Sequence, residues 1–345
     1  MTNGEEKEDM TVRIGINGFG RIGRTYLRAA LQSRAEVEVV AINDIADAAT
    51  LATLLEWDSV NGHLDGVQVD GDAILVDGVR IRVTSEREPT RVDWAAAGVD
   101  VVIESTGRFT DAAGARRHLA AGARKVIISA PADGDVPALV LGVNDDTLDV
   151  TQEVFSNGSC TTNCLAPMVK VLHEAFGVES GLMTTIHAYT SDQRLHDAPH
   201  SDLRRARAAG LSTIPTSSGA ARTIGRIIPE LDGKLTALSL RVPVPVGSIT
   251  DLTARLSRPA SVDEVNAAFR TAAVSPRMSR YLAYSEAPLV SADIVGNPHS
   301  AVFDAPLTQV VGDQVKVFAW YDNEWGFSQR LVELSLRVGS RGGGR

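Results

Sequence analysis

A cysteine flanked by hydroxyl side chains lies in the segment Gly158-Ser159-Cys160-Thr161-Thr162-Asn163-Cys164. Apolar residues follow at helical spacing, so a helix is predicted to begin near Cys160. The first turn of a helix stabilises a thiolate through the macrodipole and through amides that lack intrahelical partners. The pattern predicts a cysteine nucleophile, and a buried, inert cysteine is the alternative interpretation.

A glycine-rich turn, Gly18-Phe19-Gly20-Arg21-Ile22-Gly23, directly follows a β-branched segment and precedes an amphipathic one. In this context Gly18 permits a tight turn, Gly20 lets a pyrophosphate approach the backbone, and Gly23 lets helix and strand pack closely. A second β-branched segment ends at Asp44, where a carboxylate can accept hydrogen bonds from an adenosine ribose. The pattern predicts dinucleotide binding, and NAD is favoured over NADP because Asp44 would repel a 2′-phosphate. A glycine-rich turn without a ligand is the alternative.

A nicotinamide cofactor beside a reactive thiol indicates aldehyde oxidation, because an aldehyde cannot donate hydride until its carbonyl carbon becomes tetrahedral. Cys160 can form that adduct. A base must then accept the hydroxyl proton, and imidazole is the side chain best matched to neutral pH. Among 7 histidines, His187 ends an apolar strand and precedes the polar residues 189–192. We predict that His187 is the base, with a hydrogen-bonded core histidine as the alternative.

The first part of the chain alternates short β-branched segments with longer alanine-rich amphipathic ones. This alternation predicts an α/β fold with an N-terminal Rossmann-type, doubly wound, mostly parallel sheet. Predicted strands cover residues 12–16, 37–42, 99–104, 125–129 and 139–143, and predicted helices cover 21–31 and 111–121. Residues 66–83 alternate with a period of two between Gly and Asp turns, which predicts an antiparallel insertion at the sheet edge.

After Cys160 the strand-like segments become longer, which predicts a second, α+β catalytic domain. Predicted strands cover 181–187, 235–242 and 315–321, and predicted helices cover 262–273 and about 324–338. The polar residues 191–215 are predicted to form a long loop that serves a site or an interface. The predicted domains are an NAD-binding domain at 1–157, a catalytic and substrate domain at 158–322, and a C-terminal part at 323–345. That last part is predicted to be a helix returning to the NAD-binding domain, followed by a mobile tail.

Composition limits the classes of protein that fit this chain. Its 345 residues are 44% hydrophobic, which is enough for roughly two domains. The net charge of −9 argues against general affinity for nucleic acid or for an anionic membrane. Only 2 cysteines occur, one helical turn apart, so a reducing compartment fits better than a disulfide framework. The acidic residues 1–9 lack the apolar core of a signal peptide, so a cytoplasmic location is predicted, and no metal site is predicted.

Taken together, these residues resemble the phosphorylating glyceraldehyde-3-phosphate dehydrogenase family from Val12 to about Val338. The motifs that carry the resemblance are Ile14-Gly15-Ile16-Asn17-Gly18-Phe19-Gly20-Arg21-Ile22-Gly23-Arg24, Ser159-Cys160-Thr161-Thr162-Asn163-Cys164-Leu165-Ala166-Pro167, Ile186-His187-Ala188-Tyr189-Thr190, Asp202-Leu203-Arg204-Arg205-Ala206-Arg207-Ala208-Ala209 and Trp320-Tyr321-Asp322-Asn323-Glu324-Trp325-Gly326.

The resemblance implies a mechanism. Cys160 would attack D-glyceraldehyde 3-phosphate, His187 would take the proton, and hydride would pass to NAD to leave a thioester. Inorganic phosphate would then release the acyl group as 1,3-bisphosphoglycerate. His187 would also be the positive partner that keeps Cys160 ionised, and the amide of Cys160 would stabilise the oxyanion of the adduct.

The resemblance also assigns binding residues. The substrate phosphate would be held by Thr190 and Arg241, and the attacking phosphate by Ser159, Thr161, Arg205, Ser218 and Gly219. For the cofactor, the backbone amides of Arg21 and Ile22 would contact the pyrophosphate, and Asn323 would hold the nicotinamide carboxamide. Further cofactor positions are Arg87, Thr106, Ser129, Pro199 and Phe327. Pro199 resembles a residue that disfavours a 2′-phosphate from a neighbouring subunit, which implies a homotetramer.

The chain departs from the family pattern at several positions near the site. Phe327 stands where the family has tyrosine, and Ser218 stands where it has threonine. In Arg241-Val242-Pro243-Val244-Pro245-Val246-Gly247-Ser248, the family carries threonine and asparagine after the two prolines. These departures suggest the hypothesis of a specialised isozyme that tolerates an electrophilic inhibitor. The alternative functions are an erythrose-4-phosphate or related aldehyde dehydrogenase, and a non-catalytic scaffold protein with this fold.

Overall fold

The computed structural model describes residues 11–340, which divide into two compact units. Unit 1 contains the residues up to Pro137, Asp149–Ser156 and the residues from Ser328 onward, and unit 2 contains Ala138–Leu148 and Asn157–Phe327. The acidic segment at 1–9 and the predicted mobile tail beyond residue 340 lie outside the described residues.

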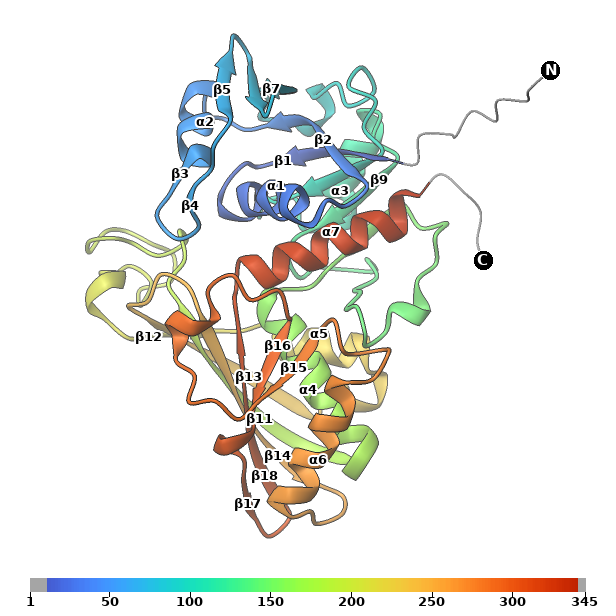
Figure 1. The fold of residues 1–345 in the computed structure, drawn as a ribbon, viewed down its shortest axis with the longest axis vertical. Coiled ribbons are helices and arrows are strands. Elements are labelled where there is room, and N and C mark those ends of the chain that lie inside the picture. The colour runs from blue at the N-terminus through green and yellow to red at the C-terminus, as the bar shows by residue number, and fades with distance from the viewer. Residues whose placement is uncertain (1–10, 341–345) are drawn as a thin grey trace, which may run out of the picture. The chain divides into compact units, whose positions relative to one another are not determined.

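Unit 1 is built on one sheet with the strand order β10-β9-β8-β1-β2-β7-β6-β5 (Figure 1). The strands are β1 (Val12–Asn17), β2 (Val37–Asn43), β5 (Val67–Asp70), β6 (Ala73–Val76), β7 (Val79–Thr84), β8 (Val101–Glu104), β9 (Lys125–Ile128) and β10 (Val154–Ser156). The central strand β1 pairs in parallel with β2 on one side and with β8 on the other. The strand order therefore reverses between β1 and β8, which confirms the predicted doubly wound α/β architecture.

The predicted antiparallel insertion is confirmed at one edge of this sheet. Strands β5, β6 and β7 pair in antiparallel fashion with one another, and β7 joins the parallel part through β2. A separate two-stranded ribbon consists of β3 (Trp57–Asp58) and β4 (Gly62–His63).

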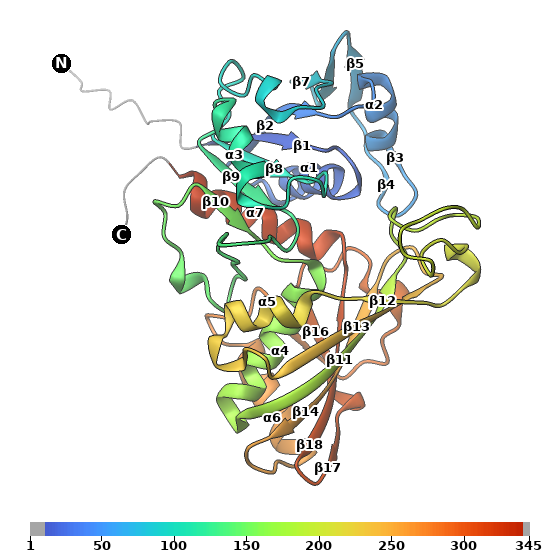
Figure 2. The same ribbon diagram turned by 180° about the vertical axis from the view of Figure 1, so that it is seen from behind.

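Helices cover both faces of the sheet of unit 1 (Figures 1 and 2). They are α1 (Arg21–Ser33), α2 (Ala48–Glu56), α3 (Ala112–Ala120) and most of α7 (Trp325–Gly339). Helix α1 lies beside α7, and the Tyr26 hydroxyl of α1 donates to Ser335 Oγ of α7 at 3.0 Å. Helix α3 begins where the side chain of Asp111 accepts from the Gly114 amide, and it packs over β9 and β10 in an apolar core that includes Trp94.

The predicted strand at 139–143 is wrong. These residues are buried but form a turn within unit 2, where Gly142 has a φ of +83°. The side chain of Asn144 stabilises the turn, since its Oδ1 accepts from the Val140 amide and its Nδ2 donates to Ala138 O. The next strand of the sheet in unit 1 is instead the three-residue β10.

Unit 2 contains a mixed sheet with the strand order β12-β13-β11-β14-β18-β16-β15, and β17 pairs with β18. Its strands are β11 (Val178–Ala188), β12 (Ile214–Ser217), β13 (Leu235–Val242), β14 (Ser248–Leu256), β15 (Leu282–Ser285), β16 (Ala301–Asp304), β17 (Gln309–Val311) and β18 (Gln314–Tyr321). Its helices are α4 (Cys160–Phe176), α5 (Ala220–Ile227) and α6 (Val262–Ala273). Short 3₁₀ turns lie at Pro89–Arg91 in unit 1 and at Asp145–Thr147, Ala209–Leu211, Pro229–Leu231, Ser291–Ile294 and Ala305–Leu307 in unit 2.

One face of this mixed sheet forms the core of unit 2 with α4, α5 and α6. Met183 on β11 points into this core and is 2% exposed, whereas its neighbour Leu182 points to the other face and is 65% exposed. The alternation follows from the two-residue period of a strand. The second face of β11 and β13 therefore carries apolar side chains that no helix covers among the described residues.

Candidate active site

Cys160 is the first residue of α4, and its surroundings explain why the helix begins there. Gly158 has a φ of +65°, which turns the chain into the helix, and Ser159 is the N-cap residue. The Ser159 hydroxyl accepts a hydrogen bond from the Thr162 amide at 3.0 Å. Asn163 secures the same turn by donating to Asn157 O and to Ser159 O. The thiol of Cys160, a residue of intermediate exposure, is thereby fixed at the amino end of a seventeen-residue helix.

His187 reaches the same point from β11, where it is the second-last residue. Its Nε2 atom lies 3.4 Å from Cys160 Sγ, so the structure brings together the predicted nucleophile and the predicted base. His187 is paired in register with Arg241 of the neighbouring strand β13. Strand pairing therefore brings the imidazole and the guanidinium together in unit 2, at the place where the start of α4 holds the thiol.

The ring nitrogen Nδ1 of His187 has two competing contacts. With a proton on Nδ1 it donates to Ala188 O at 2.6 Å, and without one it accepts from Nη1 of Arg241. Arg241 Nη1 also donates to Ala188 O at 3.1 Å. The tautomer with the proton on Nδ1 leaves the lone pair of Nε2 facing Cys160, so this tautomer is the one that can act as a base.

Burial determines the ionisation of the two groups. Burial raises the pKa of the Cys160 thiol, and the nearby charge of Arg241 only partly offsets this effect. Burial, reinforced by Arg241, lowers the pKa of His187 to about 3. At neutral pH the pair in this structure is therefore a thiol beside a neutral imidazole. This result differs from the expectation that a positively charged His187 keeps Cys160 ionised, because burial disfavours both charged forms.

Tyr321 is a structural partner of this site that sequence reasoning missed. Its hydroxyl bridges Thr161 Oγ1 at 3.0 Å and Thr185 Oγ1 at 2.7 Å, and its ring forms a T-shaped pair with the ring of His187. Burial raises the pKa of Tyr321, so the phenol keeps its proton for this bridge. The signal in the sequence was weak, since Tyr321 only continues the apolar alternation of β18.

The residues predicted for the attacking phosphate lie in several elements of unit 2. Arg205 donates from Nε to Thr216 Oγ1 at 2.8 Å, while its Nη1 contacts Asp192. The hydroxyl of Thr161 is engaged by Tyr321. The turn before α5 contains Ser218 and Gly219, and Gly219 is the N-cap residue of that helix. The N-cap Gly219 provides no side-chain hydrogen bond to the first amides of α5.

Of the two residues predicted for the substrate phosphate, only Arg241 is in direct contact with the Cys160–His187 pair. Thr190 lies just beyond β11, and its amide donates to Gln193 Oε1 at 3.2 Å. Between Arg241 and β14, Gly247 has a φ of +88°, and a Cβ atom there would lie 2.3 Å from Ser291 O. Glycine at position 247 is therefore required by the backbone.

Asn323 is held in one orientation within unit 2. Its Oδ1 accepts from the Gly247 amide at 3.2 Å and from the Ser248 hydroxyl at 3.0 Å. Ser248 Oγ in turn accepts from the Ala188 amide, next to His187. With Oδ1 engaged, the Nδ2 group of Asn323 is the donor that remains for a ligand, as a carboxamide-binding residue requires.

The glycine-rich turn of unit 1 fits a dinucleotide. A Cβ atom on Gly18 would lie 2.8 Å from the Thr106 amide nitrogen, and one on Gly23 would lie 2.4 Å from Gly18 O. By contrast, a Cβ atom on Gly20 would meet nothing within 4 Å, so the space above the start of α1 is open. Gly20 is also the N-cap residue and supplies no side-chain hydrogen bond to the helix amides. The helix N-terminus is thus accessible to a phosphate group.

Asp44 lies beside this turn at the end of β2. Its Oδ2 accepts from the Phe19 amide at 2.7 Å, and its Oδ1 accepts from the Ala46 amide at 3.0 Å. The carboxylate is partly exposed, so it has further lone pairs to offer to ribose hydroxyls.

The other predicted cofactor residues are distributed over both units. Thr106 and Ser129 follow β8 and β9, and the Ser129 amide donates to Glu104 O at 3.0 Å. Arg87 is exposed beyond β7. In unit 2, Pro199 is exposed in the long loop and Phe327 is buried. The side chain of Arg21 pairs with Asp58, while Ile22 follows it in the first turn of α1.

Within residues 11–340, no group of three or more His, Cys, Asp or Glu side chains could hold a metal ion. No helix in the same range combines the length and the apolar character needed to cross a membrane.

Comparison with known proteins agrees with this geometry. Residues 12–112 match the family model "Glyceraldehyde 3-phosphate dehydrogenase, NAD binding domain", and residues 159–323 match the model of the C-terminal domain of the same family. The chain is 58% identical over 337 residues to glyceraldehyde-3-phosphate dehydrogenase of Mycobacterium avium, covering 96% of this chain and 99% of the relative. The enzyme of the same name from Mycobacterium tuberculosis (strain H37Rv) gives the same values. Glyceraldehyde-3-phosphate dehydrogenase 1 of Streptomyces avermitilis is 57% identical over 332 residues, with the same coverage.

Proposed function

The chain belongs to the glyceraldehyde-3-phosphate dehydrogenase family, and from this premise we propose how its own residues carry the reaction. The enzyme oxidises D-glyceraldehyde 3-phosphate with NAD and captures the acyl group with inorganic phosphate as 1,3-bisphosphoglycerate. The observation that carries the proposal is the distance of 3.4 Å between Cys160 Sγ and His187 Nε2 at the start of α4. A nucleophile within hydrogen-bond reach of a base is what covalent aldehyde oxidation requires.

The first step is addition of the thiol to the aldehyde. His187 Nε2 takes the proton of the Cys160 thiol as sulfur attacks the carbonyl carbon. The backbone N–H of Cys160, at the positive end of α4, stabilises the oxyanion that forms. The imidazolium then returns the proton to that oxygen, which leaves a hemithioacetal and a neutral imidazole.

The second step is oxidation, for which NAD held by the glycine turn, Asp44 and Asn323 would supply the acceptor of the hydride from the hemithioacetal carbon. His187 takes the hydroxyl proton at the same time, so a thioester remains on Cys160. In the third step a phosphate dianion attacks the thioester and loses its proton to solvent. The Cys160 thiolate leaves and receives the proton held by His187, which restores the starting state.

Arg241 links substrate binding to the state of His187. In the structure its guanidinium contacts Nδ1 of His187. A substrate phosphate offers Arg241 a stronger, charge-assisted partner. When the guanidinium turns to the phosphate, Nδ1 keeps only its contact with Ala188 O, and the base-competent tautomer prevails.

The residues proposed to bind the attacking phosphate already contact other side chains, and the phosphate must compete with these contacts. Asp192 and Asp202 both lie beside Arg205. A phosphate would replace Asp192 at Nη1 of Arg205 and would gain the hydroxyl of Ser218 and the amides at Gly219. Thr190 assists Arg241 at the substrate phosphate, and Ser159 and Thr161 complete the attacking-phosphate position.

The cofactor residues are proposed from the fit of the glycine turn. Amides at the start of α1 would contact the pyrophosphate, and Asp44 would accept from the adenosine ribose. Asn323 would donate from Nδ2 to the nicotinamide carboxamide. The remaining proposed positions are Gly18, Gly20, Arg21, Ile22, Gly23, Arg87, Thr106, Ser129, Pro199 and Phe327.

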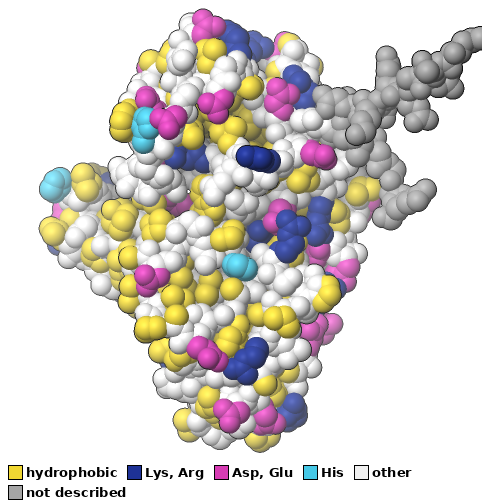
Figure 3. Space-filling view, viewed as in Figure 1, with side chains coloured by type: hydrophobic (Ala, Val, Ile, Leu, Met, Phe, Trp, Pro, Cys, Tyr) yellow, Lys and Arg dark blue, Asp and Glu magenta, His cyan; other side chains and the backbone are white. Residues whose placement is uncertain are grey.

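A homotetramer is proposed because unit 2 exposes apolar surface. Figure 3 shows hydrophobic side chains gathered on the side of unit 2 away from α4 and α6. On the sheet face Leu182 is 65% exposed, and in the long loop Leu195 and Leu203 are 79% and 82% exposed. Self-association would cover this surface. Light scattering after size exclusion tests the proposal, since a monomer at micromolar concentration would contradict it.

A reducing cytoplasm suits an enzyme whose nucleophile is a free thiol. Both cysteines are free in the structure, and oxidation of Cys160 would remove the attacking group. The proposed location is therefore cytoplasmic, which cell fractionation would test.

An activity assay tests the proposed function directly. NADH formation is expected with glyceraldehyde 3-phosphate, phosphate and NAD, and it should disappear in Cys160→Ser. Cys164→Ala is the matched control, because Cys164 is buried in the core of unit 2 and its thiol donates to Ala319 O. A higher kcat/KM with erythrose 4-phosphate, or no turnover of either aldehyde by the wild type, would contradict the proposal.

A further inference from the structure

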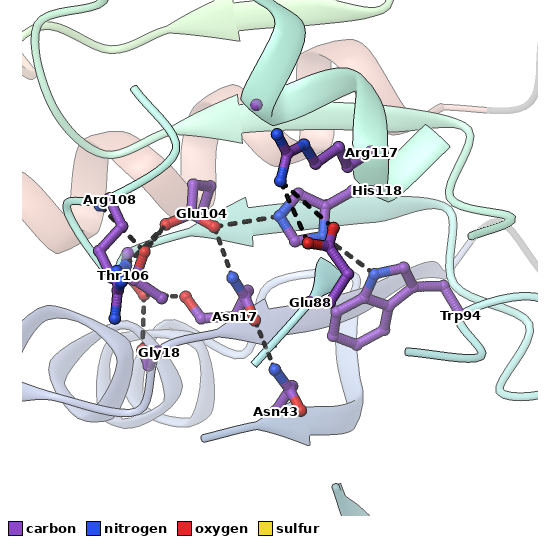
Figure 4. Close-up of polar contacts among 12 residues, drawn as sticks. Asn17, Gly18, Asn43, Glu88, Trp94, Glu104, Thr106, Arg108, Arg117 and His118 are labelled. Carbon is purple, nitrogen blue, oxygen red and sulfur yellow. Dashed lines mark hydrogen bonds and ion pairs between the residues drawn. The ribbon is translucent and has the colours of Figure 1, made fainter. Parts of the chain in front are cut away.

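A buried carboxylate lies in unit 1, outside the chemistry described above. Glu104 is the last residue of β8, and it is 1% exposed. Its Oε2 accepts from Asn17 Nδ2 at 2.6 Å and from His118 Nε2 at 3.0 Å (Figure 4). Its Oε1 accepts from the Thr106 amide at 2.8 Å and from the Thr106 hydroxyl. Each of these partners donates a hydrogen bond to Glu104, as a carboxylate requires where water is excluded.

His118 is the one ionisable partner of Glu104 in the part of the chain that the structure describes. The imidazole is fully buried in α3, and its Nδ1 atom lies 3.1 Å from Nε1 of Trp94. An indole nitrogen can only donate, so Nδ1 must accept and the ring proton must be on Nε2. Trp94 thereby fixes the tautomer in which His118 donates to Glu104.

The hydrogen bonds of Glu104 span the place where the strand order reverses. Asn17 is the last residue of β1, and Glu104 is the last residue of β8. These two strands are neighbours, and the next strands, β2 and β9, lie on opposite sides of the pair. From Asn17 the chain of hydrogen bonds continues through Asn43 at the end of β2, whose Nδ2 donates to Asn17 Oδ1 at 2.8 Å. Dinucleotides bind outside the carboxyl ends of the strands at this kind of reversal.

The two ends that Glu104 joins both border the glycine turn. Asn17 directly precedes Gly18, and the Thr106 amide lies against Gly18 so closely that no Cβ atom would fit between them. Ser105 adds a further connection by donating to Gly18 O at 2.6 Å. A shift of the Glu104 carboxylate would therefore move Thr106 and the glycine turn together.

Loss of one donor would produce such a shift. A buried carboxylate that lacks a partner is unfavourable, so the side chain would rotate toward new donors or admit water. Either change releases the two hydrogen bonds with Thr106. His118 touches none of the proposed ligand-binding residues itself and acts only through Glu104.

We propose that His118 is a positioning residue for the dinucleotide site, which holds Glu104 so that Thr106 and the glycine turn keep the shape that receives the cofactor. This inference rests on the proposed binding of NAD by unit 1. It concerns the half of the site at the boundary of β1 and β8, whereas Asp44 serves the adenosine half at the end of β2.

Two substitutions of His118 separate positioning from simple packing. His118→Gln places an amide N–H near the position of Nε2 and can still donate to Glu104. His118→Asn places its polar group near Nδ1, where it can face Trp94 but cannot reach Glu104. Val154→Ala, a core truncation in β10, is the control for general loss of stability in the same unit.

Isothermal titration with NAD, and separately with adenosine, which lacks a phosphate for the glycine turn, gives the readout. His118→Asn should weaken NAD binding by about tenfold, the loss expected for one buried hydrogen bond to a charged group. His118→Gln should restore most of the affinity, adenosine binding should change little in either variant, and Val154→Ala should lower the melting temperature without weakening NAD binding.

The proposal is overturned if His118→Asn binds NAD as the wild type does, if His118→Gln is equally impaired, or if adenosine binding falls in parallel. Should His118→Asn not fold, Glu104→Gln tests the same point. The side-chain N–H₂ group of the new glutamine would face groups that themselves donate, so it could not accept their hydrogen bonds. Wild-type affinity for NAD in Glu104→Gln would then contradict the proposal. Failure of the wild type to bind NAD would instead refute the proposed function.

Discussion

Cys160 Sγ lies 3.4 Å from His187 Nε2, although the two residues come from the first turn of α4 and from the far end of β11. The Ser159 cap fixes the position of the thiol, and pairing of β11 with β13 fixes that of the ring. The contact joins two rigid elements, so its geometry does not depend on a mobile loop.

The buried imidazole should make stability depend on pH. The pKa of His187 is about 3 in the folded protein, against 6.5 for an ordinary histidine. Between these values the unfolded chain binds a proton that the folded chain does not. The free energy of unfolding should therefore fall as pH drops below 6.5, by up to about 1.4 kcal/mol per pH unit. Urea unfolding from pH 7.5 to 4.5 measures this slope, which His187→Gln should reduce; equal slopes for both proteins would contradict the burial argument.

Removing the guanidinium of Arg241 should affect phosphorylated substrates selectively. Arg241→Gln should raise KM for glyceraldehyde 3-phosphate by about ten- to a hundredfold, the range for a charge-assisted hydrogen bond. The kcat/KM for unphosphorylated glyceraldehyde should change far less. Arg207→Gln is the control, because Arg207 is exposed and pairs with Asp197. If Arg241→Gln impairs both aldehydes to the same degree, the phosphate role of Arg241 is wrong.

The carboxylate of Asp44 should decide between the two nicotinamide cofactors. Asp44→Asn should lower kcat/KM with NAD by about tenfold, because a charged acceptor for the ribose is lost. Activity with NADP should rise relative to NAD, since the repulsion of a 2′-phosphate disappears. Asp47→Asn serves as the control, because Asp47 only caps α2. An unchanged ratio of NAD to NADP activity would remove Asp44 from this role.

The hydroxyl of Tyr321 should stabilise unit 2. Tyr321→Phe leaves the hydroxyls of Thr161 and Thr185 without their bridge, which should cost about 1–3 kcal/mol in the free energy of unfolding. Tyr284→Phe removes a hydroxyl that also has two partners, Arg270 and Glu286, but both contacts are exposed to solvent, so it should cost less than about 0.5 kcal/mol. Equal losses in the two variants, measured by urea unfolding, would show that the bridge does not stabilise the site.

Sequence reasoning predicted the elements whose signals are local. The helix at Cys160, the strand that ends at His187 and the glycine turn at Gly18 each combine a motif with a clear hydrophobic period, and the structure has all three. The segment 139–143 failed because a buried apolar turn and a short buried strand have the same composition. Strand β10 has only three residues, too few to show any period.

Contacts between distant residues were not predictable. The Glu104–His118 pair joins a strand end to a helix, and Trp94 lies 24 residues before His118 in an irregular segment. No spacing rule connects such positions until the sheet is assembled. The same holds for the contact of Arg241 with His187, which depends on the register between β11 and β13.

Mass spectrometry of the enzyme during turnover tests the central claim most directly. The protein is mixed with NAD and glyceraldehyde 3-phosphate in the absence of inorganic phosphate, quenched in acid and digested. We expect a glyceryl phosphate thioester on the peptide that contains Cys160, formed in step with a burst of NADH and absent from Cys160→Ser. A full burst of NADH without an acyl group on Cys160, or with the acyl group on another residue, would contradict the account.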